Sequence, residues 1–432
     1  MKLHGSMKIE GNELSIGGVR CMELAKKYQT PLYVIDEELV REKCREYIQN
    51  FEVIGGRNKV AYAGKAFLPL YMCKIIEEEN MCLDVVSGGE LYTANKANFP
   101  MDKIFFHGNN KTREEISMGI EFGVGRFVVD NFYELDLIEE ICEEKDRYQE
   151  IYFRITPGIE AHTHEYIKTG QIDSKFGFAL VNGDLERALE RMSEYKRIKL
   201  VGLHAHIGSQ IFDLDPFLDT VDIMMKLVSD IGKNHDIHLK DIDLGGGVGV
   251  YYTKEDEPME IKEFCEKILD RSKKTCSELG IDVPNLVIEP GRSIIANAGS
   301  TLYTVGSIKD IKDVRVYVSV DGGMTDNVRP SLYHAGYECS IVNKVNNEKV
   351  NKVTIAGKCC ESGDILITDA DVMNIESGDI LITTSTGAYG YSMSSNYNKI
   401  PRSAVVVVKD GIDKLICKRQ SYEELMYLEI GE

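Results

Sequence analysis

Val60-Ala61-Tyr62-Ala63-Gly64-Lys65 is a short apolar run that ends in a glycine and a single amine. It opens a pattern that continues to residue 292, in which short β-branched or aromatic runs alternate with segments of helical periodicity. Strands are predicted at 60–64, 83–87, 104–107, 127–130, 151–156, 201–206, 242–245 and 286–289. Such strand–helix units predict a closed parallel (β/α)8 barrel rather than an open sheet, with the chemistry at the C-terminal strand ends.

The character of the sequence changes after about residue 298, where strand-like runs separated by glycine-rich turns predict an all-β domain. Its strands are predicted at 302–308, 314–320, 338–345, 353–355, 365–367, 379–384, 404–409 and 415–419, and a closing helix at 421–427. The opening segment is also strand-like, at 8–10, 14–16 and 31–35. We therefore expect residues 1–37 and 299–432 to form one sandwich- or barrel-like β domain, and residues 38–298 to form the barrel.

The amino-acid composition and charge argue against several classes of protein and of binding partner. The chain has 432 residues, 43% hydrophobic and 28% charged, which is ample material for buried cores. Its net charge of −19 argues against nucleic acid and anionic membranes as partners. The 11 cysteines include no CxxC pair, and no stretch approaches the length of an apolar membrane span. We expect a reduced, cytoplasmic protein with no signal peptide and no membrane span.

Lys65 is the first candidate catalytic residue. A lysine that ends a buried strand stands at the edge of a packed core, where desolvation lowers the amine's pKa and makes it a better nucleophile toward an aldehyde. The alternative is an ordinary solvated lysine at a strand end.

A predicted anion site supports the first interpretation. Gly245-Gly246-Gly247 after the seventh strand can bring backbone N–H groups close to a phosphate, and Ser209 and Gly291-Arg292 follow neighbouring strands. An amine and a phosphate cradle in one barrel mouth indicate pyridoxal phosphate. Glu289 would then face the pyridine nitrogen and keep it protonated, and His206 would stack on the ring. The alternatives are a flexible glycine loop, an ion pair for Glu289 and a core histidine at 206.

A metal site is the rival hypothesis for this region. His204 and His206 are separated by one residue, so they face the same way on a strand, as a metal pair requires. Metal-dependent barrel hydrolases of the amidohydrolase type place such a pair on the first strand, whereas this pair lies on the sixth. We therefore predict no metal.

Longer motifs identify a family. They are Tyr62-Ala63-Gly64-Lys65-Ala66, Asp84-Val85-Val86-Ser87-Gly88-Gly89-Glu90, His162-Thr163-His164 through Asp173-Ser174-Lys175-Phe176-Gly177, His206-Ile207-Gly208-Ser209-Gln210, Glu289-Pro290-Gly291-Arg292, Asp321-Gly322-Gly323-Met324-Thr325-Asp326-Asn327, Cys360-Glu361-Ser362 and Gly387-Ala388-Tyr389. With them the chain resembles the fold-type III pyridoxal-phosphate-dependent amino-acid decarboxylases, and within these the diaminopimelate decarboxylases. The resemblance runs from Pro31 to Pro401.

The resemblance implies a role for each motif. Lys65 would form the Schiff base with the cofactor and act in catalysis with Cys360. The cofactor would be held by Lys65, His206, Ser209, Gly247, Glu289, Pro290, Gly291, Arg292 and Tyr389. The substrate would be held by Arg292, Arg329, Tyr333, Glu361 and Tyr389. Cys360 would come from the partner subunit of an obligate head-to-tail homodimer. Phe67 and Ala205 depart from the family's usual asparagine and cysteine, at positions without an assigned role.

The implied activity is decarboxylation of meso-diaminopimelate to L-lysine and CO2, the last step of lysine biosynthesis. The residues agree with it, because Arg292 and Arg329 can grip the distal carboxylate and Glu361 can pair with the distal ammonium. Two alternatives stay open. One is a related decarboxylase acting on ornithine, arginine or a carboxylated polyamine, and the other is a non-catalytic binding protein.

Overall fold

The computed structural model describes residues 1–52, 57–158 and 174–431, and its chain forms two compact units. We call the first the β unit; it consists of Met1–Glu42, Val250–Glu257 and Ser293–Glu432. The second, the barrel unit, consists of Lys43–Gly249 and Pro258–Arg292. No helix of the described residues is both long enough and apolar enough to cross a membrane.

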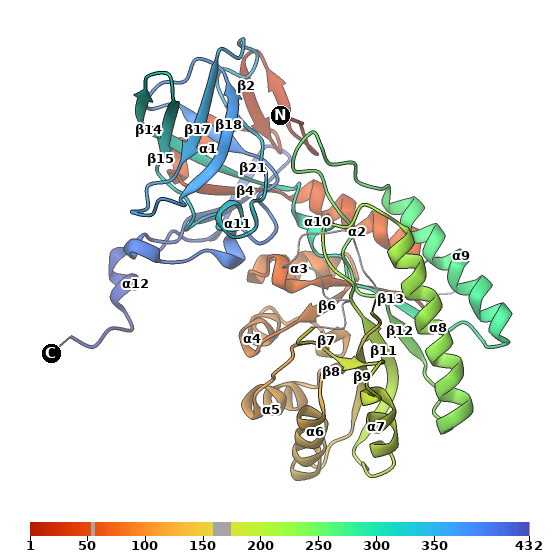
Figure 1. The fold of residues 1–432 in the computed structure, drawn as a ribbon. Helices are drawn as coiled ribbons and strands as arrows, with labels where there is room; N and C mark the ends of the chain where they lie inside the picture. Colours follow the sequence, from red (N-terminus) through yellow and green to blue (C-terminus); the bar gives the residue numbers. More distant parts are fainter. Residues whose placement is uncertain (53–56, 159–173, 432) are drawn as a thin grey trace. The chain divides into compact units, whose positions relative to one another are not determined.

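The barrel unit is built on eight parallel strands that close into a barrel, as predicted (Figure 1). They are β5 (Lys59–Ala63), β6 (Cys82–Val85), β7 (Ile104–Phe106), β8 (Arg126–Val129), β9 (Gln149–Thr156), β11 (Ile198–Ala205), β12 (Asp241–Asp243) and β13 (Asn285–Ile288). β13 pairs with β5 and β8 pairs with β9, so that no edge is left open. A two-residue strand, β10 (Phe178–Ala179), adds to β9. Each predicted barrel strand overlaps one of the eight.

Helices follow most of the strands. They are η1 (Gly64–Ala66), α3 (Leu70–Glu78), α4 (Gly88–Lys96), η2 (Met101–Lys103), α5 (Arg113–Phe122), α6 (Phe132–Glu144), α7 (Asp184–Arg191), α8 (Asp215–His235), α9 (Ile261–Leu279) and α10 (Arg292–Ile295), with α2 (Glu37–Phe51) ahead of the first strand. Ser87, Thr112 and Asn131 cap the N-termini of α4, α5 and α6 by accepting hydrogen bonds from backbone N–H groups of the first turn. These caps stand directly after strands or their short loops, and so fix where each helix begins.

An apolar floor fills the barrel. Seven side chains from seven strands form one buried cluster: Ala61, Cys82, Phe105, Val128, Tyr152, Val201 and Val287. On the remaining strand, β12, Asp241 accepts a hydrogen bond from the Tyr152 hydroxyl at 2.7 Å. A barrel of eight strands is narrow enough for side chains to fill, so a ligand can bind only at its ends.

The β unit contains a mixed sheet built from both ends of the chain, as predicted. Its order is β18 (Ile365–Val372), β17 (Asn351–Ala356), β15 (Arg315–Val320), β14 (Gly299–Ile311), β4 (Leu32–Asp36), β20 (Ala404–Lys409) and β21 (Ile412–Cys417), and β16 (Cys339–Ile341) and β19 (Ile380–Thr383) branch from β14. β4 pairs antiparallel with β14 and parallel with β20. The N-terminal strand is thus an interior strand of the C-terminal sheet.

A second small sheet covers part of this one. β1 (Lys8–Glu10), β2 (Glu13–Ile16) and β3 (Val19–Arg20) form it, and α1 (Cys21–Tyr28) follows. Their apolar side chains share one buried cluster with those of β4, β14, β19 and β20. The burial of this cluster is the main stabilising contribution that joins the two chain ends. The strand-like interpretation of the opening segment missed α1.

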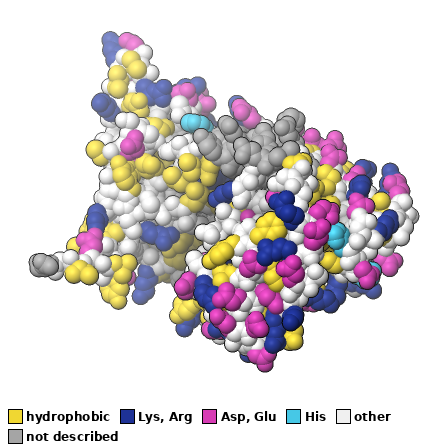
Figure 2. Space-filling view, turned by 60° about the horizontal axis from the view of Figure 1, so that its bottom comes forward, with side chains coloured by type: hydrophobic (Ala, Val, Ile, Leu, Met, Phe, Trp, Pro, Cys, Tyr) yellow, Lys and Arg dark blue, Asp and Glu magenta, His cyan; other side chains and the backbone are white. Residues whose placement is uncertain are grey.

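The strand predicted at 338–345 is shorter than expected, since β16 ends at Ile341. The chain turns directly after it, and further along the Asn346 N–H donates to the Asn12 side-chain oxygen at 2.7 Å. The closing helix α12 (Tyr422–Met426) lies within the predicted range. On the face drawn in Figure 2, acidic and basic side chains are interspersed, which is typical of solvated surface.

Candidate active site

A polar layer lies on the apolar floor of the barrel, toward the C-terminal ends of the strands. Strand alternation returns a side chain to the same face every second residue, so the positions two beyond the floor residues also face inward. They are Asp84, His107, Asp130, Arg154, Asp243 and Glu289. His204 joins them because β11 shifts register at the bulge between Leu200 and Gly202 and then pairs His204 with Arg154. All but Arg154 are buried, and its side chain is only 11% exposed.

Glu289 is the centre of this layer. Its Oε1 lies 2.6 Å from His107 Nε2, and its Oε2 lies 3.2 Å from His204 Nε2. The two imidazole rings meet edge to face, with centroids 4.8 Å apart. The contact with His107 is short but is not aligned as a hydrogen bond, because neither atom has a partner of hydrogen-bonding geometry among the described residues. His204 and Glu289 do form one.

Burial and neighbouring charge set the protonation states. Burial lowers the pKa of His204 to about 3, so its ring is neutral, and its Nε2 must carry the hydrogen that it donates to Glu289. Burial by itself would raise the pKa of Glu289, but His107 and His204 hold it well below its usual range. Burial raises the pKa of Asp84, and burial together with the charge of Glu289 raises that of Asp243 well above its usual range. Of Glu289 and Asp243, Glu289 is therefore the one whose ionised form is favoured.

Arg154 is the permanent cation of the layer. Its Nε lies 3.9 Å from Asp130 Oδ1, and its guanidinium stacks over the Phe176 ring at 4.1 Å. An arginine stays charged even when it is buried, so it offsets part of the negative charge of the surrounding carboxylates.

The glycines after β12 approach the neighbouring backbone closely. A methyl group at Gly246 would lie 2.1 Å from the carbonyl oxygen of Glu289, and one at Gly247 would lie 2.4 Å from that of Gly208. Gly247 also has a φ of 123°, which a side chain disfavours. No larger residue fits this loop, and a loop of this kind presents backbone N–H groups to an anion.

Ser209 and Arg292 stand together beside the predicted cradle. The Nε and Nη2 atoms of Arg292 donate to the Ser209 hydroxyl at 3.1 and 3.0 Å. Arg292 is buried and Ser209 is half-buried, so the two hydrogen bonds fix a cation beside a hydroxyl. That pair suits a phosphate oxygen.

His206 lies at the same edge of the barrel. The Gly246 N–H donates to its Nδ1 at 3.3 Å, so the neutral ring carries its hydrogen on Nε2. Burial lowers the pKa of His206 well below the usual range, and the positive charges of Lys65 and Arg154 act in the same direction. A neutral, fixed imidazole can lie against a flat ring.

Lys65 differs from its prediction in one respect. It follows β5 in the 3₁₀ turn η1, as expected, but the residue is exposed rather than enclosed. The enclosed environment that the sequence predicted for this residue is therefore not observed. Its amine is instead accessible to a ligand that enters the barrel mouth.

These residues fit pyridoxal phosphate. The barrel unit supplies an accessible amine at Lys65, a cation with a hydroxyl and a glycine loop for a phosphate, and at Glu289 a carboxylate whose ionised form is favoured. An ionised carboxylate suits a protonated ring nitrogen. Polar atoms of His107, His204, Asp243 and Glu289 also lie within 4.8 Å of one another, close enough for a metal ion. Because both histidines contact Glu289, a network of polar contacts accounts for this closeness, and the absence of a metal stays a prediction.

The β unit holds the remaining predicted residues. Arg329 begins the short helix α11 (Arg329–Tyr333) and is buried. Its guanidinium lies over the Tyr252 ring at 4.6 Å and the Tyr337 ring at 5.6 Å, and it donates to the Tyr337 hydroxyl. Tyr333 and Tyr389 are half-buried. Arg329 is thus rigidly oriented, which suits either a ligand contact or a structural role.

Cys360 and Glu361 are exposed in a loop that Asp364 positions. The Asp364 carboxylate accepts hydrogen bonds from the backbone N–H groups of Met324 at 2.6 Å and Cys359 at 2.8 Å. It thereby joins the Cys360 loop to the glycine-rich segment after β15.

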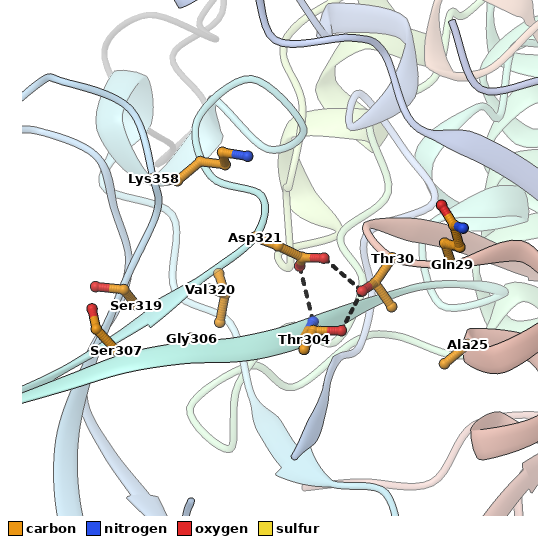
Figure 3. A pocket seen from close by; sticks show the side chains of 10 residues that line it. All are labelled: Ala25, Gln29, Thr30, Thr304, Gly306, Ser307, Ser319, Val320, Asp321 and Lys358. Carbon is orange, nitrogen blue, oxygen red and sulfur yellow. Dashed lines mark hydrogen bonds between the residues drawn. The ribbon is translucent and has the colours of Figure 1, made fainter. Parts of the chain in front are cut away.

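A cavity of about 570 Å³ in the β unit contains none of the predicted site residues (Figure 3). Asp321 lines it, and both of its oxygens are bonded within the unit, to the Thr30 hydroxyl at 2.6 Å and the Thr304 N–H at 2.9 Å. The carboxylate is therefore already satisfied and offers little to a ligand.

The structure also shows polar residues that the sequence analysis did not assign to the site: Asp84, His107, Asp130, Arg154 and Asp243. The signal was present, because each is a polar residue within or directly after an otherwise apolar strand. The motif residues His162, His164 and Asp173 lie outside the described residues.

Comparisons with known proteins show which family the chain resembles. Residues 37–296 match the family model of the pyridoxal-dependent decarboxylase, pyridoxal binding domain. The chain is 50% identical to the diaminopimelate decarboxylase of Bacillus subtilis, with 100% of this chain and 98% of that protein covered. It is 43% identical to the enzyme of the same name from Staphylococcus aureus, at 96% and 97% coverage. Among solved structures, diaminopimelate decarboxylase from M. jannaschii in complex with L-lysine matches with a TM-score of 0.93 and 38% identity, covering 99% of this chain and 98% of that one.

Proposed function

Because the chain belongs to the pyridoxal-dependent decarboxylases, we propose that it removes one carboxyl group from meso-diaminopimelate and releases L-lysine and CO2. This is the last step of lysine biosynthesis. The observation that carries the proposal is the constellation of the barrel unit, namely the accessible Lys65 amine, the Ser209–Arg292 pair and the Glu289 carboxylate. Full-length similarity to enzymes named for this substrate supports the choice of substrate.

In this proposal, different residues of the barrel unit contact different parts of the cofactor. Lys65 would bind its aldehyde covalently, and Ser209, Gly247 and Arg292 would hold its phosphate. Glu289 would keep a proton on its ring nitrogen, and His206 would lie against its ring. Pro290 and Gly291 shape the loop between Glu289 and Arg292. When bound, pyridoxal phosphate supplies the electron sink that accepts the electrons left by the departing carboxylate.

The β unit supplies substrate recognition in this proposal. The fixed guanidinium of Arg329 binds the distal carboxylate with both of its nitrogens, and Tyr333 and Tyr389 line the same site. Arg292 contributes a second positive charge, and Glu361 pairs with the distal ammonium group. A substrate without a distal amino-acid end, such as ornithine, would leave Arg329 without a carboxylate, and it should be a poor substrate for that reason.

Cys360 or Lys65 would return the proton to the substrate carbon after CO2 has left, and we place Cys360 in the active site of the partner subunit of a homodimer. Its exposure and the Asp364 contacts that fix its loop support a role outside its own core. We also propose a cytoplasmic location, which the unpaired state of all the cysteines supports.

The test is lysine release from meso-diaminopimelate by the purified protein supplied with pyridoxal phosphate. The L,L isomer and ornithine serve as competitors, and Lys65→Ala is the inactive control. Lysine should form only from the meso compound. Equal turnover of ornithine would indicate the related amine-forming decarboxylases instead. A wild-type protein that binds no cofactor would indicate a non-catalytic binding protein.

A further inference from the structure

Asp243 stands in the polar layer with no role in the chemistry described so far. It ends β12, directly before the glycine loop, and it is fully buried. Its Oδ1 accepts a hydrogen bond from the Gly245 N–H at 2.9 Å. Its Oδ2 is buried, and no donor among the described residues bonds to it. Burial, the charge of Glu289 and a side-chain hydrogen bond with Glu289 all raise the pKa of Asp243.

The surroundings of Oδ2 are negative. The Asp243 carboxyl lies within 4.8 Å of Glu289, His107 and His204, and the charges that act on it most are those of Glu289 and Asp84. The ring of His204 is neutral. The layer's permanent cation, Arg154, lies beside Asp130. An unpaired buried anion next to another anion is costly, and such a carboxyl takes up a proton instead.

We propose that Asp243 is a positioning residue held as a neutral acid, with its proton on Oδ2, so that Glu289 is the anion of the pair that faces the cofactor nitrogen. Two carboxyls this close do not both ionise, and the proton settles where the anion has fewer donors around it. Glu289 has two histidines beside it, whereas Asp243 has only the backbone N–H of Gly245. That Glu289 faces the cofactor nitrogen rests on the proposed function. That the proton lies on Asp243 does not rest on it.

The arrangement has a consequence for the reaction. If the proton lay on Glu289, the cofactor nitrogen would face a neutral acid and would lose the partner that keeps it protonated. Asp243 also holds the first glycine of the cradle through Oδ1. One residue thus links the glycine loop to the charge state of Glu289.

Asp243→Asn is the discriminating variant, because an amide keeps the acceptor for Gly245 and is neutral, like the protonated acid. We expect its dissociation constant for pyridoxal phosphate to stay within about threefold of wild type. Asp84→Asn is the matched control, since Asp84 is the other carboxyl of the layer whose burial favours protonation. The variants are compared by infrared difference spectroscopy in H2O and D2O, on protein with and without cofactor.

The wild type should show protonated-carboxyl absorbance that shifts in D2O; Asp243→Asn should remove one component of it, and Asp84→Asn should leave that component in place. A spectrum that Asp243→Asn leaves unchanged in this region would overturn the proposal. So would a change of more than about tenfold in cofactor affinity, which would indicate the loss of a charge. Neutron diffraction of the wild-type holoenzyme needs no variant: a deuteron on Asp243 Oδ2 supports the assignment, and one on Glu289 refutes it. A wild type that binds no cofactor yet keeps that component would defeat the proposed function alone.

Discussion

Arg329→Lys separates substrate recognition from scaffolding in the β unit. The substitution keeps the positive charge but removes the planar fork that binds a carboxylate through two nitrogens. The loss of one charge-assisted hydrogen bond should weaken binding of meso-diaminopimelate by about 2 kcal/mol, or roughly thirtyfold. The stacking on Tyr252 and the bond to Tyr337 would also weaken. We expect that to lower the free energy of unfolding by about 1 kcal/mol.

The assay is a titration of substrate dissociation, followed by the spectral change of the bound cofactor, together with a melting curve. Tyr337→Phe is the matched control, because it removes the hydroxyl that Arg329 contacts and keeps the ring. It should cost about 1 kcal/mol of stability and leave substrate affinity within about threefold of wild type. Unaltered affinity of Arg329→Lys together with a large fall in melting temperature would refute the reasoning. Arg329 would then be structural, and the distal carboxylate would need another partner.

Lys65→Ala should abolish the absorbance of bound cofactor and nearly all activity, because the covalent route is lost; a yellow, active variant would contradict the assignment. Glu289→Gln should keep the cofactor bound but slow decarboxylation strongly, and an unchanged single-turnover rate would exclude its role. Mixed Lys65→Ala and Cys360→Ala subunits should regain roughly a quarter of wild-type activity if Cys360 acts across the dimer; inactive mixtures with demonstrated subunit exchange would place it elsewhere. Burial lowers the pKa of His4 to about 4, so its contribution to stability is complete above pH 6.5 and is lost as the pH falls toward 4. His4→Gln should reduce that acid-induced loss in melting curves recorded between these pH values, and an identical slope would disprove it.

The fold was readable from the sequence because its signals are local. Each barrel strand is an apolar run bounded by turns, and the helices after β6, β7 and β8 begin at polar caps that the sequence displays. The strand predicted at 338–345 failed for a non-local reason. The segment after it bonds to Asn12, more than three hundred residues away, and no local pattern reports that contact.

The site was predictable only where its residues give a local signal in the sequence. Lys65, Glu289 and the glycine loop stand out as polar or glycine-rich strand ends. His107 and Asp243 do not, because one polar residue beside an apolar run has many explanations until the barrel brings the strands together. His204 depends on the bulge at Leu200 and Gly202, which decides the face it occupies and is not visible in a periodic pattern. The exposure of Lys65 depends on the loops around the barrel mouth in the same way.

The position of β4 between β14 and β20 has a consequence for how the chain is made. Ribosomes deliver the N-terminus first, so β4 emerges long before either of its partners, and the barrel can close while this strand still lacks both neighbours. An unpaired apolar strand is prone to self-association, which exposes the nascent chain to aggregation over most of its synthesis. Completion of the sheet waits for residues 404–409. A truncation before Ala404 should therefore yield a closed barrel attached to an incomplete, aggregation-prone β unit. The dependence on chaperones should be greatest before residues 404–409 have been synthesised.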